Sequence, residues 1–135
     1  MSPRPEVIDG NLYFRIRDGS KPPTVPADEL IAELRKSIEA ARLAVADADA
    51  ECRHARADLA HALVTGREPD RARHEAAVPD LEACKLRLSV LKSQHAEAVR
   101  LADEHAAKSA ANQAKARVQS ILQRFDLTRF YARQH

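Results

Sequence analysis

The stretch TGREPD, residues 65 to 70, interrupts an otherwise helical pattern and decides how this chain folds. Gly66 suits the left-handed position that follows a helix, and Asp70 suits the N-cap of the next one. Two helices joined by so short a connection pack side by side in opposite directions. We therefore expect a mainly α fold, a long antiparallel helical hairpin with helices over residues 27–65 and 71–125, and a separate tail over 126–135.

Both predicted helices carry small or apolar side chains at alternating spacings of three and four residues, which is the pattern of a coiled-coil seam. The seam is rich in Ala, which lets the helix axes approach closely. Its first half comprises Ile31, Leu34, Ile38, Ala41, Val45, Ala48, Cys52, Ala55, Leu59 and Ala62. Its second half comprises Leu81, Cys84, Leu88, Leu91, His95, Ala98, Ala102 and His105.

The register of the two helices has two candidate values, because facing residues in an antiparallel hairpin have numbers that add to a constant. A constant of 136 sets small against large, as in Ala48 with Leu88, and places Cys52 opposite Cys84. It also requires a kink near Pro79, since an interior proline removes a helical hydrogen bond. A constant of 143, with the second helix starting at that proline, packs as well. We favour 136 and leave 143 open.

The N-terminal stretch VIDGNLYFRI, residues 7 to 16, predicts a β-hairpin around Asp9-Gly10, followed by a Pro-rich linker that ends at residue 25. Because the second helix outlasts the first, we expect this hairpin to pack near the C-terminal end of the second helix. There the apolar stripe shifts in phase to Ala111, Ala114, Val118, Ile121 and Phe125, and Leu12, Phe14 and Ile16 would cover it. The alternatives are a hairpin that is disordered or paired with another subunit.

No residue pattern points to catalysis, a cofactor or a metal, so we expect a protein that is not an enzyme. Glu51 and Asp58 each precede a histidine by three residues, the spacing of some metal-binding helices, but a solvated charged face explains them better. His95 and His105 fall on the seam as core or rim groups. We expect Cys52 and Cys84 to be free thiols in a reducing compartment.

Charge and aromatic residues gather near the two ends of the chain. From residue 108 onward six Lys or Arg accompany one Asp, a net charge of +5 within a total of +2. All five aromatic residues lie in the terminal segments, which the hairpin brings to the same end. We therefore expect a basic, aromatic head that binds a partner or nucleic acid through Lys115, Arg117, Arg124, Phe125, Arg129, Phe130, Tyr131, Tyr13, Arg15 and Arg17.

The function that this pattern favours is that of a helical interaction or assembly protein, with a protein partner at the head. The alternative is a nucleic-acid-binding protein that uses residues 108–135. We expect a homodimer in a four-helix bundle, because apolar residues also lie off the seam: Leu30, Leu43, Leu63, Val64, Leu86, Val90, Val99 and Leu101. The chain shows neither a membrane-spanning run nor a secretory signal, so we expect a cytoplasmic location. Its Ala and Arg content resembles that of proteins from GC-rich bacteria or their phages.

Overall fold

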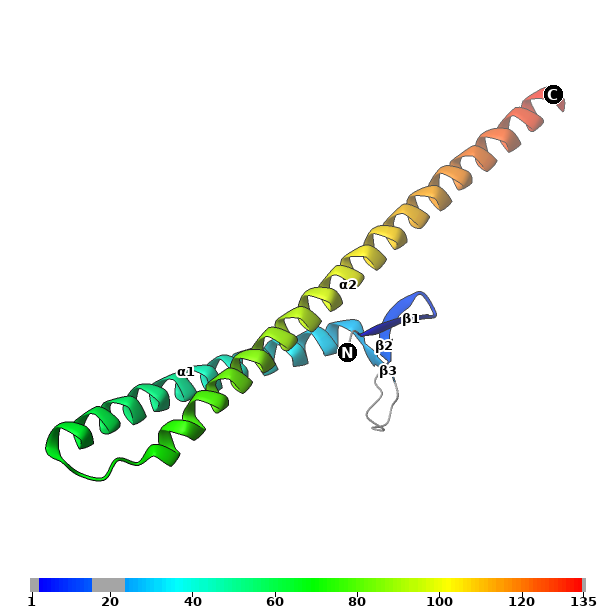
Figure 1. Cartoon of the computed structure of the whole chain (residues 1–135). Helices are drawn as coiled ribbons and strands as arrows, with labels where there is room; N and C mark the ends of the chain where they lie inside the picture. Colours follow the sequence, from blue (N-terminus) through cyan, green and yellow to red (C-terminus); the bar gives the residue numbers. More distant parts are fainter. Residues whose placement is uncertain (1–2, 16–23, 135) are drawn as a thin grey trace.

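The computed structural model describes residues 3–15 and 24–134, with side chains up to Asp126. Three strands precede two helices, and the helices form an antiparallel hairpin (Figure 1). The elements are β1 (Arg4–Ile8), β2 (Asn11–Arg15), β3 (Thr24–Pro26), α1 (Ala27–Thr65) and α2 (Arg71–Gln134). The predicted fold class is confirmed, including the long helical hairpin and the N-terminal β-hairpin.

The connection between the helices is closed by the two residues that the sequence marked for it. Gly66 has a φ of 74° and its N–H bonds the Ala62 carbonyl, which ends α1. The Asp70 carboxylate accepts a hydrogen bond from the Arg73 backbone N–H at 3.1 Å, which satisfies a free donor in the first turn of α2. Both helix boundaries at the turn therefore agree with the prediction.

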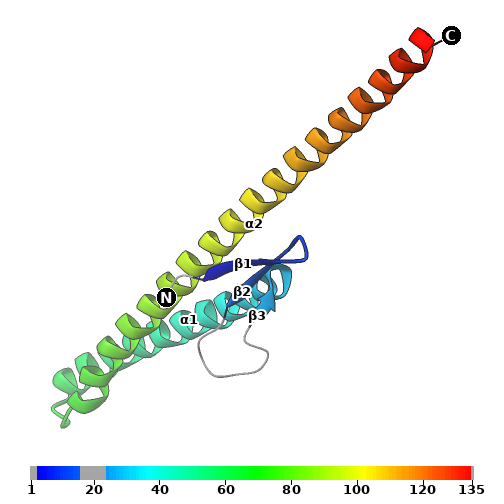
Figure 2. The same ribbon diagram turned by 90° about the vertical axis from the view of Figure 1, so that its right-hand side faces the viewer.

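Helix α2 is longer than the sequence indicated. It passes through Pro79 as one continuous helix and extends to Gln134 (Figures 1 and 2). Pro79 and Glu75 are both exposed, so water can bond the Glu75 carbonyl that the proline leaves without a donor. The predicted helix end at residue 125 and the separate tail over 126–135 are therefore wrong.

The seam is confirmed, but its register differs from both predicted values. Every predicted seam position is buried or half-buried. The Cys52 thiol donates a hydrogen bond to the Ala77 carbonyl at 3.1 Å, and the numbers of these two residues add to 129. The prediction that Cys52 faces Cys84 is therefore wrong, and both residues are free thiols.

A register of 129 differs from 136 by one heptad, and this explains the error. A slip of seven residues still places seam against seam, so periodicity alone cannot choose between such registers. The choice is made by the connection at residues 66–70, which runs back beside the end of α1 (Figure 1). The last turn of α1 then projects past the start of α2, and Val64 is 87% exposed.

An arginine holds the closed end of the hairpin together. The Arg73 guanidinium bonds both carboxylate oxygens of Glu51, at 2.6 and 3.1 Å, and also bonds Asp58. These hydrogen bonds hold the pKa of Glu51 below its ordinary value of 4.5 and raise the pKa of Arg73. The clamp joins one residue of α2 to two residues that lie about two turns apart on α1.

Replacing Arg73 with Gln is expected to lower the melting temperature at pH 7. Because the pKa of Glu51 is lowered in the folded state, its contribution is present above the unfolded pKa and is lost as the pH falls through the folded pKa. The gap between wild type and variant should therefore close in the acid range below 4.5. Thermal melts followed by circular dichroism at pH 7, 5 and 3 measure it. Arg87→Gln, on an exposed arginine, is the control and should show no such gap.

The N-terminal segment is a three-stranded antiparallel sheet in the order β1-β2-β3. Asp9 and Gly10, with φ values of 52° and 81°, form the tight turn between β1 and β2. The sequence missed β3, which pairs with β2 through Val25 opposite Phe14. This third strand gives the sheet more stability than an isolated hairpin has.

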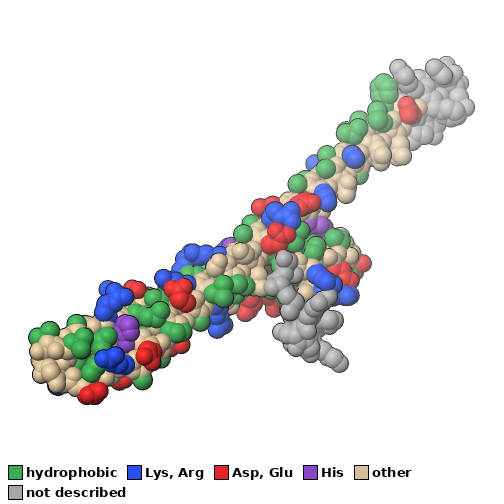
Figure 3. Space-filling model, in the orientation of Figure 1, with side chains coloured by type: hydrophobic (Ala, Val, Ile, Leu, Met, Phe, Trp, Pro, Cys, Tyr) green, Lys and Arg blue, Asp and Glu red, His purple; other side chains and the backbone are tan. Residues whose placement is uncertain are grey.

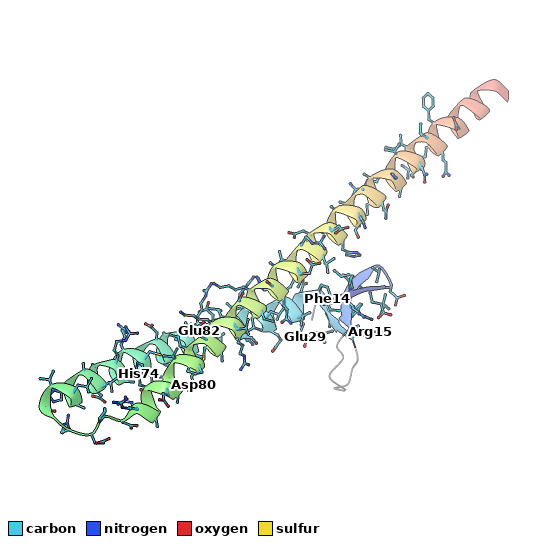
Figure 4. The ribbon with its side chains drawn as sticks, in the orientation of Figure 1. Phe14, Arg15, Glu29, His74, Asp80 and Glu82 are labelled. Atoms are coloured by element: carbon cyan, nitrogen blue, oxygen red, sulfur yellow. The ribbon has the colours of Figure 1, made fainter. Side chains whose placement is uncertain are left out.

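The sheet packs on the open end of the helical hairpin, and not on the tip of α2. Its buried Leu12 and Phe14 form one core with Ala27 and Ala98, against which Leu30, Ile31, Leu34, Leu101 and Ala102 pack. In Figure 4, Phe14 lies between the sheet and the first turns of α1. The expectation that the sheet covers the stripe from Val118 to Phe125 is therefore wrong, and Ile16 lies outside the described residues.

Candidate docking surface

Among the residues that the structure describes, no helix lies beside the part of α2 beyond residue 105, and we call this part the overhang. The register places the first residue of α1, Ala27, near residue 102 of α2, so the contact between the two helices stops there. From residue 106 to 126 every side chain is exposed except Ser109, which is half-buried. The overhang reaches Gln134 and is about 43 Å long at a rise of about 1.5 Å per residue.

Large apolar side chains occur on the outer half of the overhang. Val118, Leu122 and Phe125 are each 55% exposed, and Ile121 is 64% exposed. They lie within two helical turns of one another and so form one patch. Contiguous exposed apolar patches mark interaction sites in soluble domains, so this patch is the core of the candidate surface.

The patch belongs to a second row of residues on α2, which we call the outer row. Ile121 follows the seam residue His105 by 16 positions, a rotation of about 160° at about 100° per residue, so it faces away from α1. Figure 3 shows hydrophobic side chains on the edge of the overhang that faces away from the sheet. At spacings of three and four, the outer row comprises Ala72, Ala76, Pro79, Ala83, Leu86, Val90, Ser93, Glu97, Arg100, Glu104, Ala107, Ala111, Ala114, Val118, Ile121 and Phe125.

The predicted shift of the seam at residue 105 is therefore a change from one face of α2 to the opposite face. Along the outer row, every side chain is exposed except Glu97, which is half-buried. Its two ends are apolar, and its middle is charged. Arg100 pairs there with Glu97 at 2.6 Å and with Glu104 at 3.1 Å, which lowers the pKa of Glu97.

The charges beside the outer row differ between its two ends. Glu75, Asp80 and Glu82 flank the row near the start of α2, and Figure 4 shows Asp80 and Glu82 there. Lys115, Arg117 and Arg124 flank it on the overhang. Among the described residues, neither Glu75, Asp80, Lys115 nor Arg117 forms an ion pair, whereas Lys108 is held by Glu104 at 3.3 Å. Three carboxylates thus flank the row near the start of α2, and basic side chains flank it on the overhang.

The structure does not gather the predicted head residues in one place. Tyr13 and Arg15 lie on β2, where Arg15 pairs with Glu6 at 3.5 Å. Phe125 lies about 30 Å further along α2 from the sheet, at a rise of about 1.5 Å per residue. Lys115, Arg117 and Arg124 lie between them on the overhang. Arg17 is outside the described residues, as are the side chains of Arg129, Phe130 and Tyr131.

A groove of about 340 Å³ lies between β2, the start of α1 and α2, and its lining includes Tyr13, Pro26, Asp28 and His105. The Nε2 atom of His105 lies 3.1 Å from the Gly10 carbonyl oxygen, so this ring ties the β-turn to α2. His95 has a buried Nε2 without a hydrogen-bond partner in the described part of the chain. The groove lining contains one carboxylate, that of Asp28, and the ring of His105 already contacts the Gly10 carbonyl oxygen in the turn.

The carboxylates whose spacing from a histidine resembles that of metal-binding helices instead join the two helices of the hairpin. Glu51 and Asp58 both bond Arg73, which accounts for the carboxylates that precede His54 and His61. Within the described ranges, the structure groups no three His, Cys, Asp or Glu side chains in a way that could hold a metal ion.

The outer row is a candidate interaction surface that the sequence interpretation missed, although its spacing is visible in the sequence. In the described part of the chain, neither α1 nor α2 has a stretch that is long and apolar enough to cross a membrane.

Comparison with models of protein families, with curated proteins and with solved structures finds no match to this chain.

Proposed function

We propose that this protein is a non-enzymatic assembly protein that works as a homodimer formed through the exposed surface of α2. The observation that carries this proposal is the patch of Val118, Ile121, Leu122 and Phe125, which is 55–64% exposed on a helix without a neighbour. The free thiols Cys52 and Cys84 favour a reducing compartment such as the cytoplasm.

The off-seam residues divide into two groups in the structure. Leu30 and Leu101 pack against the core below the sheet, and Val99 is half-buried, so these three contribute little to a dimer interface. The remaining five are exposed: Leu43 at 67%, Leu63 at 62%, Val64 at 87%, Leu86 at 66% and Val90 at 43%. Leu86 and Val90 belong to the outer row, one turn apart, and support a dimer through α2.

Light scattering coupled to size exclusion tests the proposal on the full chain. We expect a mass of twice the 15.0 kDa of one chain, and the Ile121→Asp variant should shift that mass toward a single chain. Gln119→Asp, on the opposite side of the same turn, is the matched control and should leave the mass unchanged. A wild-type mass of 15.0 kDa across the micromolar range would contradict the assembly proposal.

Nucleic-acid binding is the second candidate, and the exposed basic flank of Lys115, Arg117 and Arg124 favours it. Phosphate contacts would make the affinity fall steeply with salt. Gel shifts at several salt concentrations, with the Arg117→Glu variant beside wild type, measure this dependence. A chain that shifts neither DNA nor RNA at low salt would remove this candidate.

A further inference from the structure

We propose that two copies of this chain pair in antiparallel fashion through the outer rows of their α2 helices, with facing residues whose numbers add to 197. This inference rests on the proposed dimer and names its interface. The two-fold axis then passes between residues 98 and 99, and each overhang lies along the first half of the partner's α2. Both rows have heptad spacing, so the pair would wind into a left-handed coiled coil.

Side-chain size is the first observation that supports this pairing. At a constant of 197, Leu86 faces the partner's Ala111 and Val90 faces the partner's Ala107. Ile121 faces the partner's Ala76, and Phe125 faces the partner's Ala72. Every large apolar side chain of the row meets Ala, except Val118, which meets the partner's Pro79. An alternation of large with small fills an interface without voids.

The charged middle of the row is the second observation. Glu97 faces the partner's Arg100, and by symmetry Arg100 faces the partner's Glu97. Ion pairs that already exist within each chain at this place can therefore be shared across the axis. The register one heptad higher loses the match, because it sets Val118 against the partner's Leu86 and Glu97 against the partner's Ala107.

The charges that flank the row are the third observation. In an antiparallel pair, residues beside the seam contact residues on the same side of the partner. The pairing brings Glu82 beside the partner's Arg117, Asp80 beside the partner's Lys115, and Glu75 beside the partner's Arg124. The two-fold axis repeats each of these contacts, and it also repeats the one flanking contact of like charge, Arg87 beside the partner's Lys108.

Two overhangs paired only with each other fit less well than this arrangement. Such a pairing would place Arg117 near the partner's Arg124, and like charges at flanking positions oppose association. A pairing along the whole row instead places Arg117 and Arg124 of the overhang beside the partner's Glu82 and Glu75. Neither α1 nor the sheet obstructs it, since both contact other faces of α2 (Figure 1).

Chemical cross-linking tests this register in a chain that carries Cys84→Ser. Leu86→Cys and Ala111→Cys are made singly and together, and each sample is treated with a short bismaleimide. Within one chain these positions are 25 residues, or about 37 Å, apart along one helix. In the proposed dimer, position 86 lies next to position 111 of the partner. Each position is also about 37 Å from the same position in the partner. The double variant, and a mixture of the two single variants, should therefore give covalent dimers, and either single variant alone should not.

A charge exchange tests the flanking contact independently. Arg117→Glu should raise the dimer dissociation constant by roughly tenfold, and adding Glu82→Arg should restore it. If the mass is that of a dimer but the double cysteine variant does not cross-link, this interface is wrong and the proposed assembly function stands. Failure of Glu82→Arg to rescue Arg117→Glu would also overturn the register. A wild-type monomer would overturn both proposals.

Discussion

Replacing Phe14 with Ala is expected to release the β-sheet from the helices while both helices stay folded. Phe14 is completely buried and is the largest fully buried side chain in the described part of the chain. Truncating a buried Phe costs about 3–5 kcal/mol. The sheet has strands of only three to five residues and one small core with the helices, so we expect a loss of this size to detach it.

Hydrogen exchange on residues 4–15 measures this release directly. In the Phe14→Ala variant, amides that pair in β1 and β2 should exchange much faster, while the helical circular dichroism signal stays near that of wild type. Val7→Ala is the matched control, because Val7 lies on the neighbouring strand but is 59% exposed. If the strands keep their protection without Phe14, then this side chain does not anchor the sheet.

The helical hairpin could be predicted from the sequence because its signals are local. Gly66 and Asp70 mark two helix ends by their own backbone and side-chain chemistry, and the structure shows both caps. The strand turn at Asp9-Gly10 is local in the same sense. Strand β3 is different, because Thr24–Pro26 has no pattern of its own and forms only by pairing with β2.

The register of the two helices could not be predicted, because registers that differ by seven residues give the same seam contacts. Constants of 129, 136 and 143 all place seam on seam, and they differ only in how the connection closes. This misplacement put Cys52 opposite Cys84, where the structure places Ala77. The candidate site was missed in part for a related reason, since the stripe after residue 105 was interpreted as a displaced seam. Counting spacings backward from Phe125 to Ala72 identifies it as a row of its own.

Replacing Ala98 with Glu is expected to destabilise the fold strongly. Ala98 is completely buried in a core where it joins the helices to Leu12 and Phe14 of the sheet. All of the residues that form this core are apolar, so the introduced carboxylate would have no partner. An unpaired buried charge costs several kcal/mol, which we estimate as about 3–5 kcal/mol here.

Urea unfolding followed by circular dichroism at 222 nm measures this loss, and Ala96→Glu is the matched control. Ala96 lies two residues away on the same helix but is exposed, so the control keeps the change in helix propensity and charge without the burial. Burial raises the pKa of a carboxyl group, so protonation should relieve part of the cost. The variant should therefore recover stability relative to wild type as the pH falls toward 4. Equal losses in the two variants would mean that the interface tolerates charge, and that residue 98 does not lie between the helices and the sheet.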